Sequence, residues 1–317
     1  MDVSKFALDL KVWVFAAIII GLVFGFDNEN SSAFITVALI IQMTFSFTAV
    51  ELKRSYFRDY RRQIIICILC TFVANLLITL FIGSFFKDPI GLWYGWVVFA
   101  CTPCAISILT SAFFVKADVK MAAVGVTSVY IISLILTPLL LMLILGERIR
   151  PMEVARYILM FIVIPYLGAI PLKKLKIGPT TRSVGINAML FVTTFVAVGA
   201  HRDFMFTYPD VIAWVVVACF IRLFLFMFIA VHIMRRARVP REEGMIYMQM
   251  SVFKTAGMSM TLAIILLGSV YPAAPVPGII SLPVEMVWLA FLAAKHEWVW
   301  PPDKEPEAVA STVPDCN

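Results

Sequence analysis

A succession of apolar segments, each about 20 residues long, is the feature that most constrains what this chain can fold into. The chain of 317 residues is 62% hydrophobic and only 15% charged, whereas soluble domains average about 25% charged residues. Only helices and closed barrels satisfy all their backbone polar groups in lipid, so segments of this length predict an all-α membrane protein. We expect ten membrane-crossing helices, at residues 12–26, 33–50, 63–86, 92–115, 121–145, 154–172, 184–200, 211–234, 245–269 and 278–295.

Lysine and arginine gather in alternate loops between these segments, at residues 51–62, 116–120, 173–182 and 235–241. Cytoplasmic loops carry this excess, so the pattern predicts a multi-pass protein of the cell membrane with both termini in the cytoplasm. The basic residues behind the net charge of +6 therefore act as an orientation signal and do not indicate a nucleic-acid partner. The first apolar run lacks a small-residue cleavage site after it, so we interpret it as a retained helix. The tail 296–317, rich in proline and glutamate, is expected to be disordered.

Five crossings followed by five more place the second half of the chain upside down relative to the first. We expect residues 1–146 and 147–295 to form two inverted five-helix repeats. The fourth and ninth helices then correspond, and each contains a residue that favours a break, Pro103 and Gly257. Inverted repeats with matching interrupted helices are the pattern of a secondary transporter with its site at the bilayer midplane. We therefore expect discontinuous helices 4 and 9 to cross there.

Lys254 lies in the middle of the ninth apolar segment. A lysine at that depth costs roughly 2.5–3.5 kcal/mol on insertion scales, which indicates a function or a buried partner. Glu285 in the tenth segment is the obvious partner, and Arg222 in the eighth is a third buried charge. Two hypotheses stay open: a charged cluster around a substrate or proton path, or a structural ion pair that joins three helices. Candidate binding residues in the same segment as Lys254 are Ser251, Thr255 and Gly257.

Pro103 removes a backbone donor and predicts a break at residues 101–107. The exposed N-terminus of the following half-helix would offer N–H groups and a positive dipole to an anion, and Cys104 and Ser107 lie beside it. The alternative is that Pro103 only kinks a packed helix. Cys101 and Cys104 have no histidine nearby at ligand-like spacing, so we predict no metal site and no cofactor. Supporting polar candidates, each also explained by an interhelical hydrogen bond, are Thr71, Asn75, Thr127 and Asn187.

Residues 100–118 begin with Ala-Cys-Thr-Pro-Cys-Ala and end with Lys-Ala-Asp. This stretch resembles the bile acid:sodium symporter family, which has Ala-Cys-x-Pro-Gly-Gly followed by a Lys/Arg-Gly-Asp turn at the same spacing. The run Thr137-Pro-Leu-Leu140 and the ten-helix layout are also similar to that family. The resemblance implies an inverted-repeat carrier, with a panel of helices and a core of crossing broken helices. Such a carrier moves organic anions, often together with sodium.

The sodium ligands that the resemblance implies are largely replaced. The family's ligand positions fall on Ile108, Leu109, Ala122, Val126, Met250, Lys254, Thr255 and about Thr71. Sodium needs several hard oxygen ligands, so a sodium site of the family type is not expected. Lys254 instead falls where a bound cation would lie, as a tethered positive charge.

Two further runs are similar to the related arsenite efflux carriers. Cys104 precedes Asp118 at the spacing of the cysteine in that branch, and Leu282-Pro-Val-Glu285 resembles its Pro-Leu-Val-Glu. The branch's Asn-Asn-Phe-Glu stretch reads Lys-Thr-Ala-Gly at residues 254–257, so its carboxylate is missing. The chain matches neither branch cleanly.

These patterns predict a secondary transporter of a small organic anion, without the family's sodium sites. Proton coupling through Glu285 or Lys254, uniport and exchange all stay open, as do substrate identity and oligomeric state. The alternatives are efflux of arsenite or another metalloid with Cys104 as a ligand, and a non-transporting membrane receptor. We expect no enzyme, because the chain has no aspartate cluster for magnesium and its three histidines lie at or outside helix ends.

Overall fold

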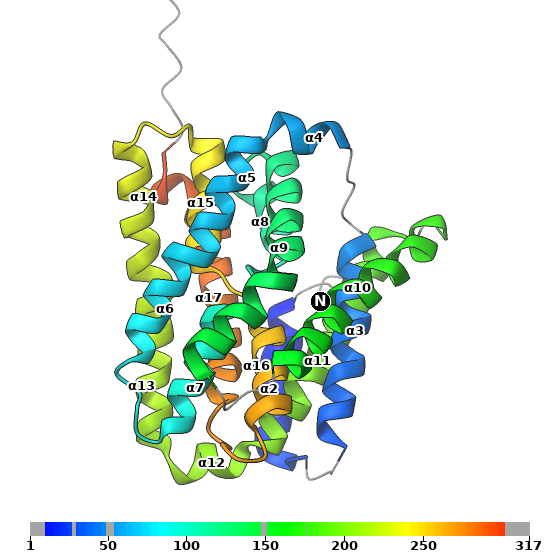
Figure 1. Ribbon diagram of the computed structural model, residues 1–317, viewed down its shortest axis with the longest axis vertical. Coiled ribbons are helices and arrows are strands. Elements are labelled where there is room, and N and C mark those ends of the chain that lie inside the picture. The colour runs from blue at the N-terminus through cyan, green and yellow to red at the C-terminus, as the bar shows by residue number, and fades with distance from the viewer. Residues whose placement is uncertain (1–9, 27–29, 49–53, 147–150, 176, 302–317) are drawn as a thin grey trace, which may run out of the picture.

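The computed structural model describes residues 10–26, 30–48, 54–146, 151–175 and 177–301, and most of them lie in helices (Figure 1). This part of the chain contains seven helical runs that are long and apolar enough to cross a membrane, by length and composition: Ser31–Thr48, Arg61–Gly83, Val119–Leu145, Met152–Lys174, Pro179–Ala200, Pro209–Arg236 and Val276–Val299. They confirm the prediction of an α-helical, multi-pass membrane protein. The predicted boundary between the two halves borders residues 147–150, which lie outside the described residues.

Four helices pack against one another as a panel, on the right in Figure 1. They are α2 (Leu10–Phe24), α3 (Ser31–Thr48), α10 (Pro151–Lys174) and α11 (Pro179–Ala200). The helix α11 packs along both α2 and α3, and α10 packs along α3. Gly21 in α2 faces α11, where a side chain would meet the Phe195 carbonyl oxygen at 3.0 Å. Glycine at such a contact lets two membrane helices approach closely.

The other long helices form a second group, the core. It comprises α5 (Arg61–Leu69), η1 (Cys70–Ala74), α6 (Asn75–Gly83), α7 (Ile90–Cys101), α8 (Ile108–Phe114), α9 (Val119–Leu145), α13 (Pro209–Phe220), η3 (Ile221–Leu225), α14 (Phe226–Arg236), α15 (Arg241–Val252), α16 (Ala256–Leu267) and α17 (Val276–Val299). The runs α5–η1–α6 and α13–η3–α14 are continuous helices with a π-helical turn in the middle. Two short helices, α4 (Arg54–Asp59) and α12 (Arg202–Thr207), connect the longer ones.

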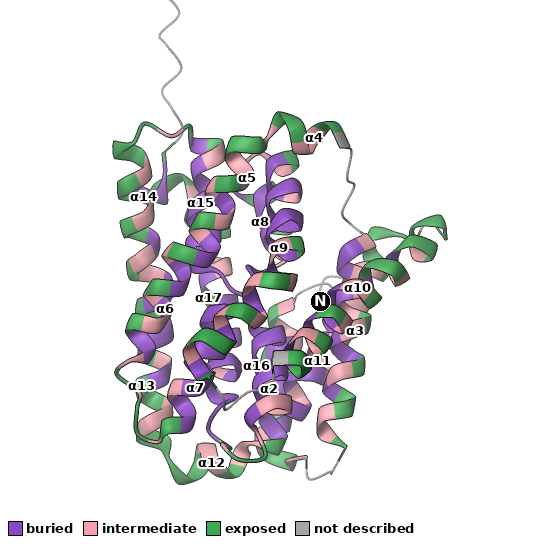
Figure 2. Cartoon of the chain, viewed as in Figure 1, coloured by how far each residue is buried: buried purple, intermediate pink, exposed green. Residues whose placement is uncertain are grey.

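Three helices of the core, α7, α15 and α16, are buried nearly all the way round (Figure 2). A helix that is apolar and buried on every side is enclosed by other helices. Most membrane helices of the chain show the opposite pattern, with large apolar side chains such as Leu77 and Ile135 exposed on one face. Polar residues on these three helices are therefore shielded from both lipid and water.

Both predicted helix breaks exist, but one is shifted. The first half-helix pair is interrupted between Cys101 and Ile108, as Pro103 predicts. The second break lies between Val252 and Ala256, and Gly257 lies inside the first turn of α16. The position of Gly257 as the break was therefore wrong. The break occurs at residues 253–255 because their backbone pairs with the first break instead of continuing the helix.

Several landmarks recur at a constant distance along the chain. The helices α7 and α15 begin at Ile90 and Arg241 and end at Cys101 and Val252, a separation of 151 positions at each end. The π-helical turns η1 and η3 begin at residues 70 and 221, which are also 151 positions apart. The match includes a rare element, so it is not a trivial consequence of alternating helices and loops.

The end of the chain is more ordered than predicted. Residues 296–299 belong to α17, and Trp300 is buried against Gly244, so the expected disorder from residue 296 is wrong for this part. The Arg241 side chain fixes the segment because its Nε donates to the Trp300 carbonyl at 2.9 Å. Residues 302–317 of the predicted tail lie outside the described residues.

Candidate functional site

The two breaks face each other and pair as a short antiparallel β-bridge between Cys104 and Lys254. The Thr255 N–H donates to the Pro103 carbonyl at 3.1 Å, and the Ala105 N–H donates to the Phe253 carbonyl at 3.4 Å. Backbone groups released by the two interruptions therefore satisfy one another, which buried backbone groups require. Four residues singled out from the sequence, from segments 150 positions apart, come together here: Pro103, Cys104, Lys254 and Thr255.

Lys254 is completely buried, and its ammonium group binds three backbone carbonyls. Its Nζ donates to the carbonyl oxygens of Ala100 at 2.8 Å, Thr102 at 2.7 Å and Thr71 at 3.1 Å. An ammonium group has three N–H donors, so all of them are used. Ala100 and Thr102 lie at the C-terminal end of α7, where free carbonyls and the helix dipole attract a cation. The lysine therefore caps α7 from the opposite break, and Thr71 contributes its carbonyl from the π-helical turn η1.

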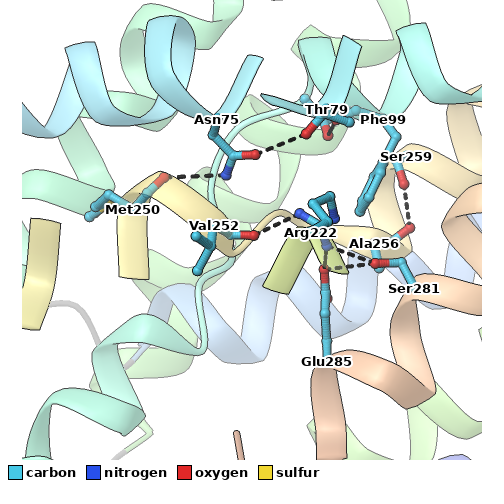
Figure 3. A network of polar contacts seen from close by, with 11 residues as sticks. Asn75, Thr79, Phe99, Arg222, Met250, Val252, Ala256, Ser259, Ser281 and Glu285 are labelled. Carbon is cyan, nitrogen blue, oxygen red and sulfur yellow. Dashed lines mark hydrogen bonds and ion pairs between the residues drawn. The ribbon is translucent and has the colours of Figure 1, made fainter. Parts of the chain in front are cut away.

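Glu285 pairs with Arg222, so Lys254, the first candidate for its partner, does not form that ion pair. The Arg222 Nη2 atom lies 2.9 Å from Glu285 Oε1 and donates to Ser281 Oγ at 2.9 Å (Figure 3). Ser281 Oγ in turn donates to the same carboxylate oxygen at 3.0 Å. The pairing follows from geometry, because the Lys254 ammonium points to the end of α7 whereas Glu285 lies beside the end of α15.

The other polar candidates divide into two kinds. Asn75 joins the site, because its Nδ2 donates to the Met250 carbonyl at 3.3 Å and its Oδ1 accepts from Thr79 (Figure 3). Ser251 and Thr127 donate to carbonyls four residues earlier in their own helices, at Tyr247 and Ala123. Such local bonds are the usual role of hydroxyls in membrane helices, and they give no reason to place Ser251 or Thr127 in a binding site.

A cavity of 760 Å³ lies between the panel and the core. Its wall includes five of the predicted site residues: Ser107, Lys254, Thr255, Gly257 and Glu285. Pro103 and Cys104 are buried behind the wall, in the bridge between the breaks. The volume lies within the range of about 300–1,000 Å³ that small-molecule sites occupy.

Two helix N-termini open onto this cavity. Ser107 precedes α8 and Thr255 precedes α16, and both line the cavity together with the first residues of these helices. Neither N-cap side chain bonds back to these first turns. Their first N–H groups donate to nearby backbone carbonyls: Ile108 to Ala105 at 3.3 Å, Leu109 to Ile106 at 3.0 Å and Ala256 to Lys254 at 3.1 Å. The positive ends of two helix dipoles therefore lie at the cavity wall and favour negative charge there.

Sequence reasoning missed the wall that the panel supplies. That wall carries Gln42, Ser46, Arg182, Ser183 and Lys11 together with the recognised candidate Asn187. A signal was present, because residues 42 and 46 and residues 183 and 187 are polar pairs four positions apart, which lie on one face of a helix. Lys11 is exposed and Arg182 half-buried, so two basic side chains flank the cavity near the ends of α2 and α11.

On the other side of the site, panel and core meet in an apolar cluster, which we call the apolar seal. It consists of Ile35, Val196, Ala197, Val198, Met260 and Ile279. Each of these residues is at most 2% exposed, so the panel and the core are in dry contact there. The cavity is therefore bounded by close apolar packing at one end and by basic residues at the other.

Within the described part of the chain, no three His, Cys, Asp or Glu side chains come together as a metal site would require. No protein-family model matches the chain, and no curated protein matches it either.

Proposed function

We propose that this protein is a secondary transporter of small organic anions in the cell membrane, with the plan of the bile acid:sodium symporters and without their sodium sites. The observation that carries the proposal is the convergence of two half-helix N-termini, at Ser107 and Thr255, on one cavity between panel and core. Paired interrupted helices whose ends face a central cavity are a recurrent design of secondary transporters.

The proposal counts ten crossings, with each broken pair of half-helices taken as one crossing. Seven helical runs are long enough alone, α2 is a shorter apolar helix, and α7/α8 and α15/α16 each add one. The separation of 151 positions between α7 and α15, and between η1 and η3, supports two repeats of five crossings. An odd number of crossings per repeat inverts the second repeat relative to the first and leaves both termini on one side. The basic loops support a cytoplasmic location for that side.

Several features favour an anion as substrate. The N-terminal ends of α8 and α16 line the cavity, and Lys11 and Arg182 flank it. The cavity-lining carboxylate, Glu285, is already neutralised by Arg222 and therefore adds little repulsion. Apolar side chains such as Met43, Leu109 and Met286 supply much of the remaining wall, which suits the carbon skeleton of an organic molecule.

Lys254 supplies the charge that a bound sodium ion would bring. Its ammonium group already has three carbonyl ligands, so it acts as a built-in cation at the end of α7 and leaves no need for an external one. It is also too fully bonded to act as the substrate's main counter-charge. Coupling to protons is assigned to Glu285, the titratable carboxylate that lines the cavity, while uniport and exchange remain compatible with the same architecture.

The direction of access follows from the two ends of the cavity. Lys11 and Arg182 lie next to the cytoplasmic loops, whereas the apolar seal closes the opposite end. The proposal therefore includes a cytoplasm-facing state, from which transport requires that the contact between panel and core at Ile35 and Ile279 opens.

Two alternatives are less well supported. A metalloid carrier would use Cys104 as a ligand, but this residue has no exposed surface and lies behind the cavity wall. An enzyme would need a cluster of titratable or metal-binding groups at the cavity, and among the described wall residues Glu285 is the single carboxylate. A receptor role would be recognised by ligand binding without any flux.

The proposal is tested by exchange in proteoliposomes. Purified protein is reconstituted into liposomes preloaded with an unlabelled organic anion, and entry of the same labelled anion is followed for a panel of mono- and dicarboxylates and sulfonates. We expect saturable exchange for some member of the panel, at the same rate in sodium and in choline buffer. Protein-free liposomes are the control. Uptake that requires sodium would contradict the built-in cation, and saturable binding without exchange for every anion would favour the receptor.

A further inference from the structure

We propose that Arg222 is a second built-in cation, whose guanidinium group fills a cation site at the end of α15 as the Lys254 ammonium group fills one at the end of α7. This inference rests on the proposed function in one respect: a carrier that works without bound alkali ions gives both sites a purpose. The site itself, and its test, depend on contacts in the core.

The Arg222 site is built from three oxygen ligands and an aromatic ring. Nη1 donates to the Val252 carbonyl at 2.6 Å, and Nη2 donates to Ser281 Oγ and to Glu285 Oε1, each at 2.9 Å (Figure 3). The guanidinium carbon lies 4.6 Å from the centre of the Phe99 ring. The side chain is fully buried, so every attraction acts at low dielectric and none is shared with water. These are the features of a specific cation site.

Val252 is the last residue of α15, just as Cys101 is the last residue of α7. Each half-helix therefore ends in carbonyls that a side-chain cation binds: Lys254 at Ala100 and Thr102, and Arg222 at Val252. The C-terminal end of a helix carries partial negative charge, and leaving it uncapped inside a membrane protein is costly. The C-terminal helix end at each break is thus capped by a cationic side chain of the same chain.

The separation of 151 positions relates the surroundings of the two sites as well. Arg222 is the second residue of η3, and Thr71 is the second residue of η1. Arg222 packs on Phe99, and Thr71 contacts Met250 with its hydroxyl 3.7 Å from the sulfur. Residues 71 and 222 and residues 99 and 250 are each 151 positions apart, so both π-helical turns contact the same position of the partner half-helix. From η1, Thr71 supplies a carbonyl that accepts from Lys254. From η3, Arg222 supplies the guanidinium group that donates to Val252.

Arg222 differs from Lys254 in one consequence, because it also positions Glu285. The carboxylate lines the cavity, and its Oε1 is held by Arg222 and Ser281. A buried carboxylate without such partners would turn away or become neutral. Arg222 is therefore a positioning residue that ties the end of α15 to the carboxylate in the cavity wall.

Chemical rescue tests this assignment. Arg222→Ala protein is expressed and purified in detergent, and its thermal unfolding is measured with low millimolar guanidinium chloride, far below denaturing concentrations. We expect Arg222→Ala to unfold at a markedly lower temperature than the unchanged protein, and guanidinium ion to restore most of that difference. Tetramethylammonium, which has no N–H donors, should restore none of it, and the unchanged protein should respond to neither ion. An equal response of both proteins to guanidinium would overturn the proposal.

A second variant keeps the test decisive if Arg222→Ala folds poorly. Arg222→Lys retains the charge but offers a single ammonium group, which does not span the Val252 carbonyl and Glu285 in the way two guanidinium nitrogens do. We expect an unfolding temperature between the other two and no rescue by guanidinium, since the lysine chain fills the space. Arg222→Lys protein as stable as the unchanged protein would show that the planar site is unnecessary. Neither measurement needs a substrate, so a failed transport assay and a failed rescue are distinguishable.

Discussion

The two broken helices of the core solve the same physical problem with different chemistry. At the end of α7, the Lys254 ammonium group binds three backbone carbonyls, and none of these contacts involves a carboxylate. At the end of α15, the Arg222 guanidinium group binds one carbonyl and the Glu285 carboxylate, which also lines the cavity. The first break is therefore held without a carboxylate, whereas the second connects a helix end to a carboxylate in the cavity wall. If the carrier is coupled to protons, the coupling belongs to the second break.

The largest effect is expected from Lys254→Met, which removes the cation at the end of α7 while nearly keeping the volume of the side chain. Three buried carbonyls lose their donor, and each unsatisfied buried group costs about 1–3 kcal/mol, so we expect a loss of roughly 3 kcal/mol or more in unfolding free energy. Anion exchange should be lost as well. Thermal unfolding in detergent and exchange in proteoliposomes measure the two effects. The exposed Lys120→Met variant is the matched control, and equal behaviour of the two variants would contradict the role of Lys254.

A smaller side chain at the same position sharpens the test. Lys254→Ala leaves the carbonyls of Ala100, Thr102 and Thr71 around an empty space of about the size of a small cation. We expect sodium or methylammonium to raise the unfolding temperature of this variant and not that of the unchanged protein. A variant that ignores every monovalent cation would show that the carbonyls do not form a cation site.

The limits of sequence reasoning are visible at these same residues. Hydropathy and Pro103 were sufficient to predict a multi-pass α-helical membrane protein and the first break, because both signals are local. The partner of Glu285 stayed open because residues 222 and 254 both lie in neighbouring apolar segments, and only the fold decides which one faces the carboxylate. The ligands of Lys254 were invisible for another reason. They are backbone carbonyls of Thr71, Ala100 and Thr102, freed by a π-helical turn and a helix end, and carbonyls have no signature in the sequence.

Glu285→Gln is expected to have the next largest effect, and on the second break alone. The glutamine still offers an oxygen to Arg222 and Ser281, but the ion pair is lost, so we expect a destabilisation of about 1–3 kcal/mol. Uptake by the unchanged protein should respond to an imposed proton gradient, and uptake by the variant should not. The measurement is anion uptake at fixed external pH with varied internal pH. A variant that keeps the full gradient response would remove Glu285 from the coupling mechanism.

Thr137→Val tests an uncharged hydrogen bond at the end of α7. The Thr137 hydroxyl donates to the Cys101 carbonyl at 2.8 Å, next to the carbonyls bound by Lys254. Valine has nearly the same shape and removes only this bond, which costs about 1 kcal/mol. We expect a slightly lower unfolding temperature and unchanged sodium independence. A loss as large as that of Lys254→Met would mean that the hydroxyl, and not the ammonium group, closes the end of α7.

The smallest effect is expected from Gly257→Ala. This variant tests whether the helix breaks at residues 253–255, as observed, or at the glycine, as the sequence suggested. Gly257 lies in the first turn of α16, and the nearest atom to an added Cβ is Leu39 Cδ1 at 3.8 Å, an ordinary contact. Alanine is also the better helix former by about 0.5–1 kcal/mol, so stability should stay equal or rise slightly. Gly278→Ala is the contrasting control, because its added Cβ would lie 2.8 Å from Ser259 Oγ and 3.0 Å from the Met260 backbone nitrogen. A strong loss of stability in Gly257→Ala would return this glycine to the break, whereas a change confined to the apparent affinity for the anion would identify it as part of the cavity wall.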